Sequence, residues 1–264
     1  MTDLPGTAEL TYGSYLELDA LLRLQRPVSE PEHPDELHFI VTHQAMELWF
    51  KVMIHELYRV LPCLADRQWA RAVTRMRRVN EIFAAQTAQM QTLNTLEPSA
   101  FLQFRHALGT ASGFQSVQFR VLEVLVGLRE PGYLTQLAST SSGVLPFDVT
   151  AALAVPSLAE VAVGVPRAAG ADDWQAVYAE PDRHAALVLL GEELLDHDRM
   201  WLRWRHEHLC LVERIIGRLV RGTGGGSSGY LEGRAAQRVF PFLWDLRRQL
   251  TLATEKNTAK EPRR

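Results

Sequence analysis

Residues 34–61 read PDELHFIVTHQAMELWFKVMIHELYRVL and contain no glycine or proline after Pro34. Pro34 and Asp35 are typical of the first turn of a helix. Apolar residues then recur at helical spacing. These apolar positions are Phe39, Met46, Phe50, Met53, Leu57 and Leu61. The stretch therefore predicts one long helix with an apolar stripe, against which the rest of the chain must pack.

His43 lies on the same stripe, four residues after Phe39 and three before Met46. Two interpretations are open from the spacing. A histidine on an apolar face is commonly a core residue that hydrogen-bonds a backbone carbonyl. Alternatively, an aromatic ring and an imidazole one helical turn apart form one wall of a buried pocket.

Strand signals are nearly absent from the remaining sequence, so the predicted fold is all-α. Helices are predicted at 11–26, 67–95, 97–109, 110–128, 182–221 and 233–251, with small helices within 147–180. Residues 130–146 are rich in Gly, Pro, Ser and Thr and predict a loop. The polar residues 252–264 predict a disordered tail.

Two further polar residues lie on apolar stripes. His208 shares the inward stripe of helix 182–221 with Trp204, so two buried histidines on long helices could face each other across a planar cofactor. Arg105 follows Phe101 by four residues and precedes Leu108 by three. It is either a surface residue with a buried stem or a clamp for a carboxylate.

Composition limits the class of protein. The 264 residues suffice for one large or two small domains, and 47% hydrophobic with 22% charged residues indicates a soluble globular protein. A net charge of −3 gives no case for nucleic acid or a membrane as partner. No apolar run long enough to span a bilayer is expected. The N-terminus lacks the features of a signal peptide, so the expected location is the cytoplasm.

Five blocks of the sequence, in this order, resemble the tryptophan 2,3-dioxygenase family. They are YGSYL (12–16), FIVTHQAMELWFK (39–51), FRHALGTASGFQSVQFR (104–120), WRHEHL (204–209) and GTGGGSSG (222–229). The resemblance covers residues 11–128 and 190–230. It implies a single helical haem domain over 1–264, built as a bundle of long antiparallel helices. Residues 129–180 would be a variable insertion.

The resemblance implies an activity and a cofactor. Such a protein binds haem b, ferrous in its active form, and opens the indole ring of L-tryptophan with O2 to give N-formylkynurenine. His208 matches the ligand of the haem iron. Ser112, Arg120 and Trp204 match positions beside the haem.

The substrate site is implied in the same way. His43 matches a catalytic histidine that hydrogen-bonds the indole N–H, and Arg105 matches an arginine that clamps the substrate carboxylate. The other matched substrate contacts are Phe39, Phe101, Leu108 and Thr223. Tyr12 and Tyr15 match tyrosines that reach a neighbouring subunit's site. This implies a homotetramer in which the segments 1–26 are exchanged.

The chain departs from the family pattern only around GTGGGSSG. One additional residue separates His208 from this block, the block carries an additional glycine, and LEGR follows Tyr230. A looser loop here would suit a modified tryptophan. A second hypothesis is therefore a haem-dependent monooxygenase that converts tryptophan or an alkylated tryptophan to an oxindole. A third is a haem-binding sensor or a non-catalytic helical scaffold.

Overall fold

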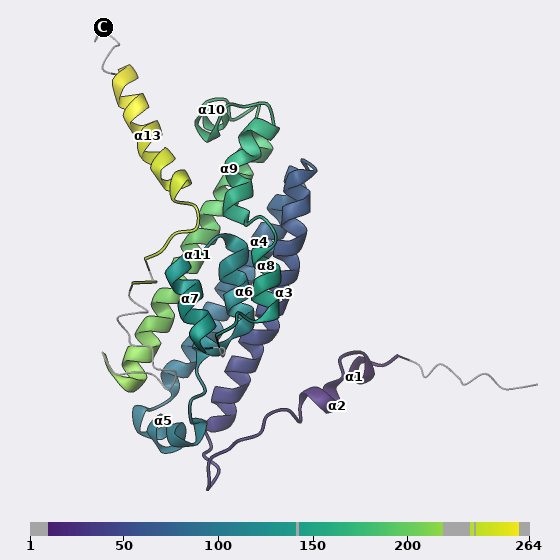
Figure 1. The fold of residues 1–264 in the computed structure, drawn as a ribbon, viewed down its shortest axis with the longest axis vertical. Coiled ribbons are helices and arrows are strands. Elements are labelled where there is room, and N and C mark those ends of the chain that lie inside the picture. Colours follow the sequence, from purple (N-terminus) through teal and green to yellow (C-terminus); the bar gives the residue numbers. More distant parts are fainter. Residues whose placement is uncertain (1–9, 141–142, 219–232, 235, 259–264) are drawn as a thin grey trace, which may run out of the picture.

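The computed structural model describes residues 10–140, 143–218, 233–234 and 236–258. Within these ranges the chain forms helices and no strands, which confirms the all-α prediction. Three long helices dominate the molecule, and most of the shorter ones pack around them (Figure 1). They are α3 (Glu36–Ala65), α4 (Trp69–Gln91) and α11 (Ala185–Ile216).

The long helices do not all alternate in direction. Gln86 and Gln89 of α4 donate to the carbonyls of Met46 and Thr42, so α4 runs antiparallel to α3. Asn80 of α4 instead bonds Glu193 and His197 of α11, and Phe83 contacts His197 and Trp201. Residue numbers rise together along that interface. The predicted antiparallel packing therefore holds for α3, while α4 and α11 run parallel.

The interior between these helices is the main core. Most of its fully buried large side chains come from the apolar stripes of the three long helices, and removal of this surface from water stabilises the fold. They include Met53, Leu57, Met76, Phe83, Leu122, Leu190, Leu194 and Trp201. Arginines on the polar side of α4 were expected to be solvated, but two of them pair with a buried carboxylate. Arg75 and Arg78 each lie 2.7 Å from a carboxylate oxygen of the buried Glu56.

Short helices follow α4 and lead back across the bundle. They are η1 (Thr92–Thr95), α5 (Pro98–Arg105), η2 (His106–Leu108), η3 (Gly113–Gln115) and α6 (Val117–Val126). Gly109, at φ 57°, ends the α5–η2 segment as predicted. Ser112 caps η3, and Ser116, which was not predicted as a cap, caps α6.

The described residues of the segment 129–180 contain four helices. Its helices are α7 (Pro131–Thr140), α8 (Phe147–Leu153), α9 (Leu158–Ala168) and α10 (Trp174–Ala179). The last three confirm the predicted small helices. The predicted loop over 130–146 is wrong where α7 forms, because Tyr133 and Leu137, one turn apart, are buried and burial outweighs weak helix propensity.

Residues 147–168 are long and apolar enough, by length and composition alone, to cross a membrane. No such helix was expected from the sequence. The segment is interrupted between α8 and α9, and Val149, Ala152 and Leu158 within it are buried in the core. These contacts suit a helix pair that packs on the bundle.

The C-terminal helix differs from its prediction. It was expected over 233–251, but α13 begins at a proline and spans Pro241–Thr258. Proline is favoured at the first helical position because its missing N–H needs no partner there. The predicted disordered tail, 252–264, is therefore wrong for 252–258. Residues 259–264 lie outside the described part.

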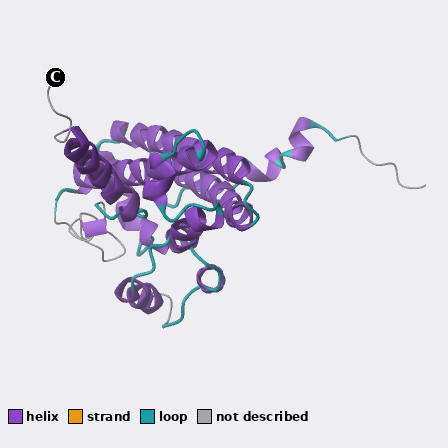
Figure 2. Cartoon of the chain, turned by 90° about the horizontal axis from the view of Figure 1, so that it is seen from above, coloured by secondary structure: helices purple, strands orange, loops and turns teal. Residues whose placement is uncertain are grey.

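The N-terminal helices α1 (Tyr12–Tyr15) and α2 (Leu18–Leu21) project away from the bundle (Figures 1 and 2). Neither helix has a buried residue. The chain then returns to α3, where the buried Glu36 carboxylate accepts hydrogen bonds from the backbone N–H groups of Val28 and Ser29. These two hydrogen bonds fix the point at which the projecting segment leaves the helical bundle.

Candidate active site

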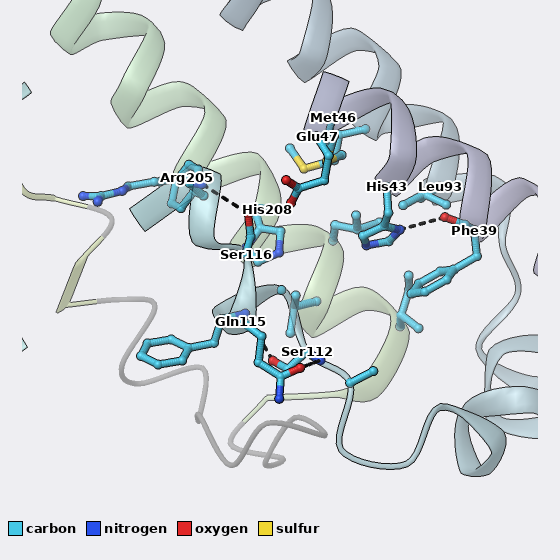
Figure 3. Close-up of a pocket in the computed structure, with 18 of the residues that line it drawn as sticks. Phe39, His43, Met46, Glu47, Leu93, Ser112, Gln115, Ser116, Arg205 and His208 are labelled. Atoms are coloured by element: carbon cyan, nitrogen blue, oxygen red, sulfur yellow. Dashed lines mark hydrogen bonds between the residues drawn. The ribbon is translucent and has the colours of Figure 1, made fainter. Parts of the chain in front are cut away.

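A cavity of about 590 Å³ opens between α3, α11 and the α5–α6 segment. The resemblance predicted twelve site residues. Two of them, Tyr12 and Tyr15, lie on the projecting segment, which leaves ten that could line this cavity. Nine of the ten line it: Phe39, His43, Phe101, Arg105, Leu108, Ser112, Arg120, Trp204 and His208. The tenth, Thr223, lies outside the described residues. Figure 3 shows part of this wall.

His43 lies on α3 with its ring open to the cavity (Figure 3). Its Nδ1 is 2.7 Å from the carbonyl oxygen of Phe39, and the two rings are 4.2 Å apart. Burial lowers the pKa of His43, against the Phe39 carbonyl and the charge of Glu47, which raise it. Both interpretations of His43 are therefore correct in part: it bonds a backbone carbonyl, and it also lines a pocket.

His208 faces the same cavity from α11 (Figure 3). Its imidazole lies parallel to the Trp204 indole, at 5.5 Å and 4°. Burial, with the nearby charges of His43 and Arg120, lowers the pKa of His208 to about 4. A neutral imidazole is the form that binds a metal. The two histidines on two long helices thus meet at one cavity, as their spacing suggested.

The part of the cavity beside α5 has an apolar wall, and the guanidinium of Arg105 lies next to it. Phe39 lies 5.6 Å from Phe101 between ring centroids. Leu108 packs on this cluster, and half-buried Arg105 lines the cavity beside it. Arg105 is therefore at the cavity wall, and its role as a clamp stays a prediction.

The turn that holds Ser112 is shaped by a reciprocal cap. The Phe114 N–H donates to Ser112 Oγ at 3.3 Å, and the Ser112 N–H donates to Gln115 Oε1 at 3.2 Å (Figure 3). This bonding is a capping box. It fixes the Ser112 side chain at the cavity rim, so the hydroxyl is already engaged with the backbone.

A buried cluster of charges at the cavity wall was not predicted. Glu123 lies 3.0 Å from Arg120, 2.5 Å from Arg205 and 3.0 Å from Arg234, and Tyr133 donates to it at 2.5 Å. Burial raises the pKa of Glu123, but the three guanidinium groups outweigh it and the net pKa is lowered. The spacing of Arg120 and Glu123 on one helix was the available signal. The partners from α11 and beyond were not deducible from spacing.

Glu47 was also missed, although it stands in the FIVTHQAMELWFK block. Its half-buried side chain lines the cavity one turn after His43. Gln118 Nε2 donates to both the Glu47 carbonyl and Oε2, each at 2.8 Å. The bond ties α6 to α3 beside the histidine. The four-residue spacing from His43 could have revealed Glu47.

Tyr12 and Tyr15 do not reach the cavity of their own chain. They are 77% and 70% exposed on α1, and neither lines the cavity. This exposure is compatible with a role in another subunit, which stays a prediction.

The sequence matches a family model described as tryptophan 2,3-dioxygenase over residues 4–142 and 169–250. The unmatched residues between these ranges, 143–168, fall within the predicted insertion 129–180 and contain α8 and α9. The match extends beyond the five blocks that carry the resemblance.

Similar proteins carry the same name. A tryptophan 2,3-dioxygenase of Caulobacter vibrioides is 39% identical, over 92% of this chain and 99% of the relative. One of a Nocardioides species is also 39% identical, over 92% of this chain and 96% of the relative. One of Xanthomonas campestris is 38% identical, over 93% of this chain and 89% of the relative.

Proposed function

The chain belongs to the tryptophan 2,3-dioxygenase family, and from this premise we propose that it opens the indole ring of L-tryptophan with O2. The product would be N-formylkynurenine. One observation carries the proposal: His43, Arg105 and His208 come from three separate helical segments and line a single cavity. A scaffold has no need of this arrangement.

Haem b suits the part of the cavity that is lined by His208, Trp204 and Arg120. His208 has a lowered pKa and lies parallel to the Trp204 ring, and its neutral imidazole would bind the haem iron. Phe50 and Phe119 add apolar wall that a porphyrin ring could contact. The Nε of buried Arg120 has no partner among the described residues, and we assign it, with Ser112, to the haem edge. When bound through His208, the haem would supply the iron that activates O2.

The protein's own residues would bind and orient the tryptophan. Phe39, Phe101 and Leu108 form an apolar slot for the indole. His43 would accept the indole N–H at Nε2, because Nδ1 is occupied by the Phe39 carbonyl. Arg105 would pair with the carboxylate. Thr223, which we expect to contact the amino-acid end, completes the proposed site.

Orientation is the main contribution of these groups to the rate. A slot that fixes the indole plane and a clamp that fixes its amino-acid end leave one orientation for the C2–C3 bond. The apolar wall also excludes water from the reacting atoms. His43 would hold the indole in place, with no requirement that it remove a proton.

The comparisons do not favour the monooxygenase alternative, since the relatives carry the dioxygenase name. The altered loop around Thr223 remains the feature that motivated it.

We also propose the homotetramer and the cytoplasmic location. The exposed Tyr12 and Tyr15 support an exchange of N-terminal segments, because two large aromatic side chains left in water suit a surface covered by another chain.

The test is a mass measurement. The protein is purified with haem, reduced, and mixed with L-tryptophan and O2, and the product is weighed. A gain of two oxygen atoms, with kynurenine-type absorbance, is expected. A gain of one oxygen atom would show the oxindole reaction instead. No product from tryptophan or from alkylated tryptophans would contradict both.

A further inference from the structure

A series of aromatic rings continues from His208 into the core. The Trp204 indole lies parallel to the His208 ring at 5.5 Å. Phe119 is 4.8 Å from Trp204 and stacks on Trp201 at 5.6 Å and 10°. Trp201 is 1% exposed. The rings therefore connect the proposed iron ligand with a fully buried tryptophan.

Two contacts extend the series from Trp201 to the edge of the molecule. The His197 ring lies 5.8 Å from Trp201. The next residue, Asp198, accepts a hydrogen bond from Nε1 of Trp244 on α13 at 3.0 Å. Trp244 is only half-buried. It is therefore the outermost indole of the series.

The three indole N–H groups differ in whether they have a hydrogen-bond partner. Nε1 of Trp204 and of Trp201 is buried without a hydrogen-bond partner among the described residues. Nε1 of Trp244 donates to the Asp198 carboxylate. Burial raises the pKa of Asp198, although hydrogen bonds to the carboxylate oppose the shift. Only the outermost indole is thus bonded to a group that can take its proton.

We propose that Trp204, Trp201 and Trp244 form an electron relay that carries an oxidising equivalent from the haem side of the cavity to the protein surface. The relay rests on the proposed haem site. An oxidised indole that cannot lose its proton is readily reduced by the next indole, so the electron vacancy moves outward. At Trp244 the Nε1 proton passes to Asp198 and the vacancy is retained.

The charge beside Trp244 acts in the same direction. The Arg238 guanidinium lies 4.2 Å from the Trp244 ring centroid. A positive charge there disfavours an indole cation and therefore favours loss of the proton to Asp198. The Arg205 guanidinium, 4.8 Å from the Trp201 ring centroid, disfavours a cation at Trp201 in the same way. Trp201 has no bonded proton acceptor among the described residues, so the electron vacancy is not retained there. The relay would direct oxidative damage to the rim of the bundle and away from the substrate slot.

The oxidant that we name is hydrogen peroxide. Its reduction to two waters consumes two electrons and two protons. Trp244 supplies both electrons in successive steps, binds the oxygen of one water, and releases two protons in total. The net reaction converts one indole and one peroxide into one hydroxyindole and one water, so atoms and electrons balance.

The six tryptophans of the chain provide internal controls. Trp49, Trp69 and Trp174 lie outside the series, and Trp49 is 41% exposed and thus reports direct attack from solvent. The haem-bound protein, verified by its absorbance, is treated with peroxide without substrate, and each tryptophan is examined by peptide mass spectrometry. Oxidation is expected to concentrate at Trp244. Equal oxidation of Trp49 and Trp244 would overturn the relay.

Two variants test the path itself. Trp201→Phe should reduce oxidation of Trp244 to the level of haem-free protein, whereas Trp174→Phe, which removes another buried indole, should leave it unchanged. If Trp201→Phe does not fold, Trp244→Phe at the half-buried end should move the oxidation inward to Trp201 or Trp204. Unchanged Trp244 oxidation in the first variant, or no inward shift in the second, contradicts the relay.

Failure of the two proposals is distinguishable. A chain that binds no haem lacks the source of the relay and overturns both. A haem-bound chain in which peroxide leaves Trp244 intact overturns the relay alone.

Discussion

The Nδ1 atom of His43 lies 2.7 Å from the carbonyl oxygen of Phe39, one turn earlier in α3. Because a carbonyl oxygen only accepts, Nδ1 carries the proton and Nε2 of the neutral ring is left as an acceptor. Burial, the largest influence, lowers the pKa of His43. The helix therefore presents a neutral hydrogen-bond acceptor to the cavity at neutral pH.

We expect His43→Ala to lower kcat/KM for tryptophan, with a loss of transition-state stabilisation of about 1–3 kcal/mol, because an indole N–H loses its partner. The same variant should act normally on 1-methyltryptophan, which has no N–H. His55→Ala, at an exposed histidine of the same helix, is the control. Equal losses with both substrates would show that His43 acts through some other contact.

Arg105→Ala should weaken tryptophan binding by roughly 2–5 kcal/mol, because the substrate carboxylate loses its charged partner, and bound substrate would shield that pair from water. Tryptamine, which lacks the carboxylate, should bind both forms alike. The measurement is titration of the haem absorbance with each ligand. Unchanged tryptophan affinity would return Arg105 to the class of surface residues.

His208→Ala should abolish stable haem incorporation, because the haem iron would lose the imidazole proposed to hold it. His206→Ala is a matched control, since His206 is exposed on the same helix two residues earlier. Haem content is read from the absorbance of the purified protein. A normal spectrum in the His208 variant would reject the assignment of the ligand.

The sequence predicted the parts of the fold that depend on local periodicity. The apolar stripe of α3 and that of α11 gave the core and placed His43 and His208 on inward faces. The roles of Phe101, Arg105 and Ser112 required the family resemblance, because an arginine on an apolar stripe is compatible with a surface position. Direction of packing was not available from the stripes, so the parallel pairing of α4 with α11 was not predicted.

The features that escaped prediction depend on contacts between distant residues. Glu123 meets Arg205 across 82 positions of the chain, and Asp198 holds the backbone of Val239 across 41. The helix α7 forms from residues of weak helix propensity because Tyr133 reaches Glu123. No local pattern records such pairings.

Glu123→Gln should lower the free energy of unfolding by about 3–5 kcal/mol, because buried guanidinium groups lose their shared counter-charge. Glu130→Gln is the matched control. Glu130 pairs with Arg234 at 3.2 Å but is 47% exposed, so its removal should cost about 0–1 kcal/mol. Urea unfolding measures the free energy of unfolding of both variants. Equal losses would mean that the three arginines do not depend on Glu123 for their counter-charge.

His197 should make stability depend on pH. It is fully buried, its Nδ1 lies 3.1 Å from Asn80 Oδ1, and burial lowers its pKa to about 3. The unfolded chain takes up a proton below about pH 6.5, whereas the native chain does not. The free energy of unfolding should therefore fall as pH decreases from about 6.5 toward 3, with about 1.4 kcal/mol per pH unit due to this residue. His197→Gln should remove that part of the slope, and His55→Gln, at an exposed site, should retain it. Urea unfolding between pH 4 and 7 measures the slopes, and identical slopes in the two variants would show that His197 is protonated in the native state.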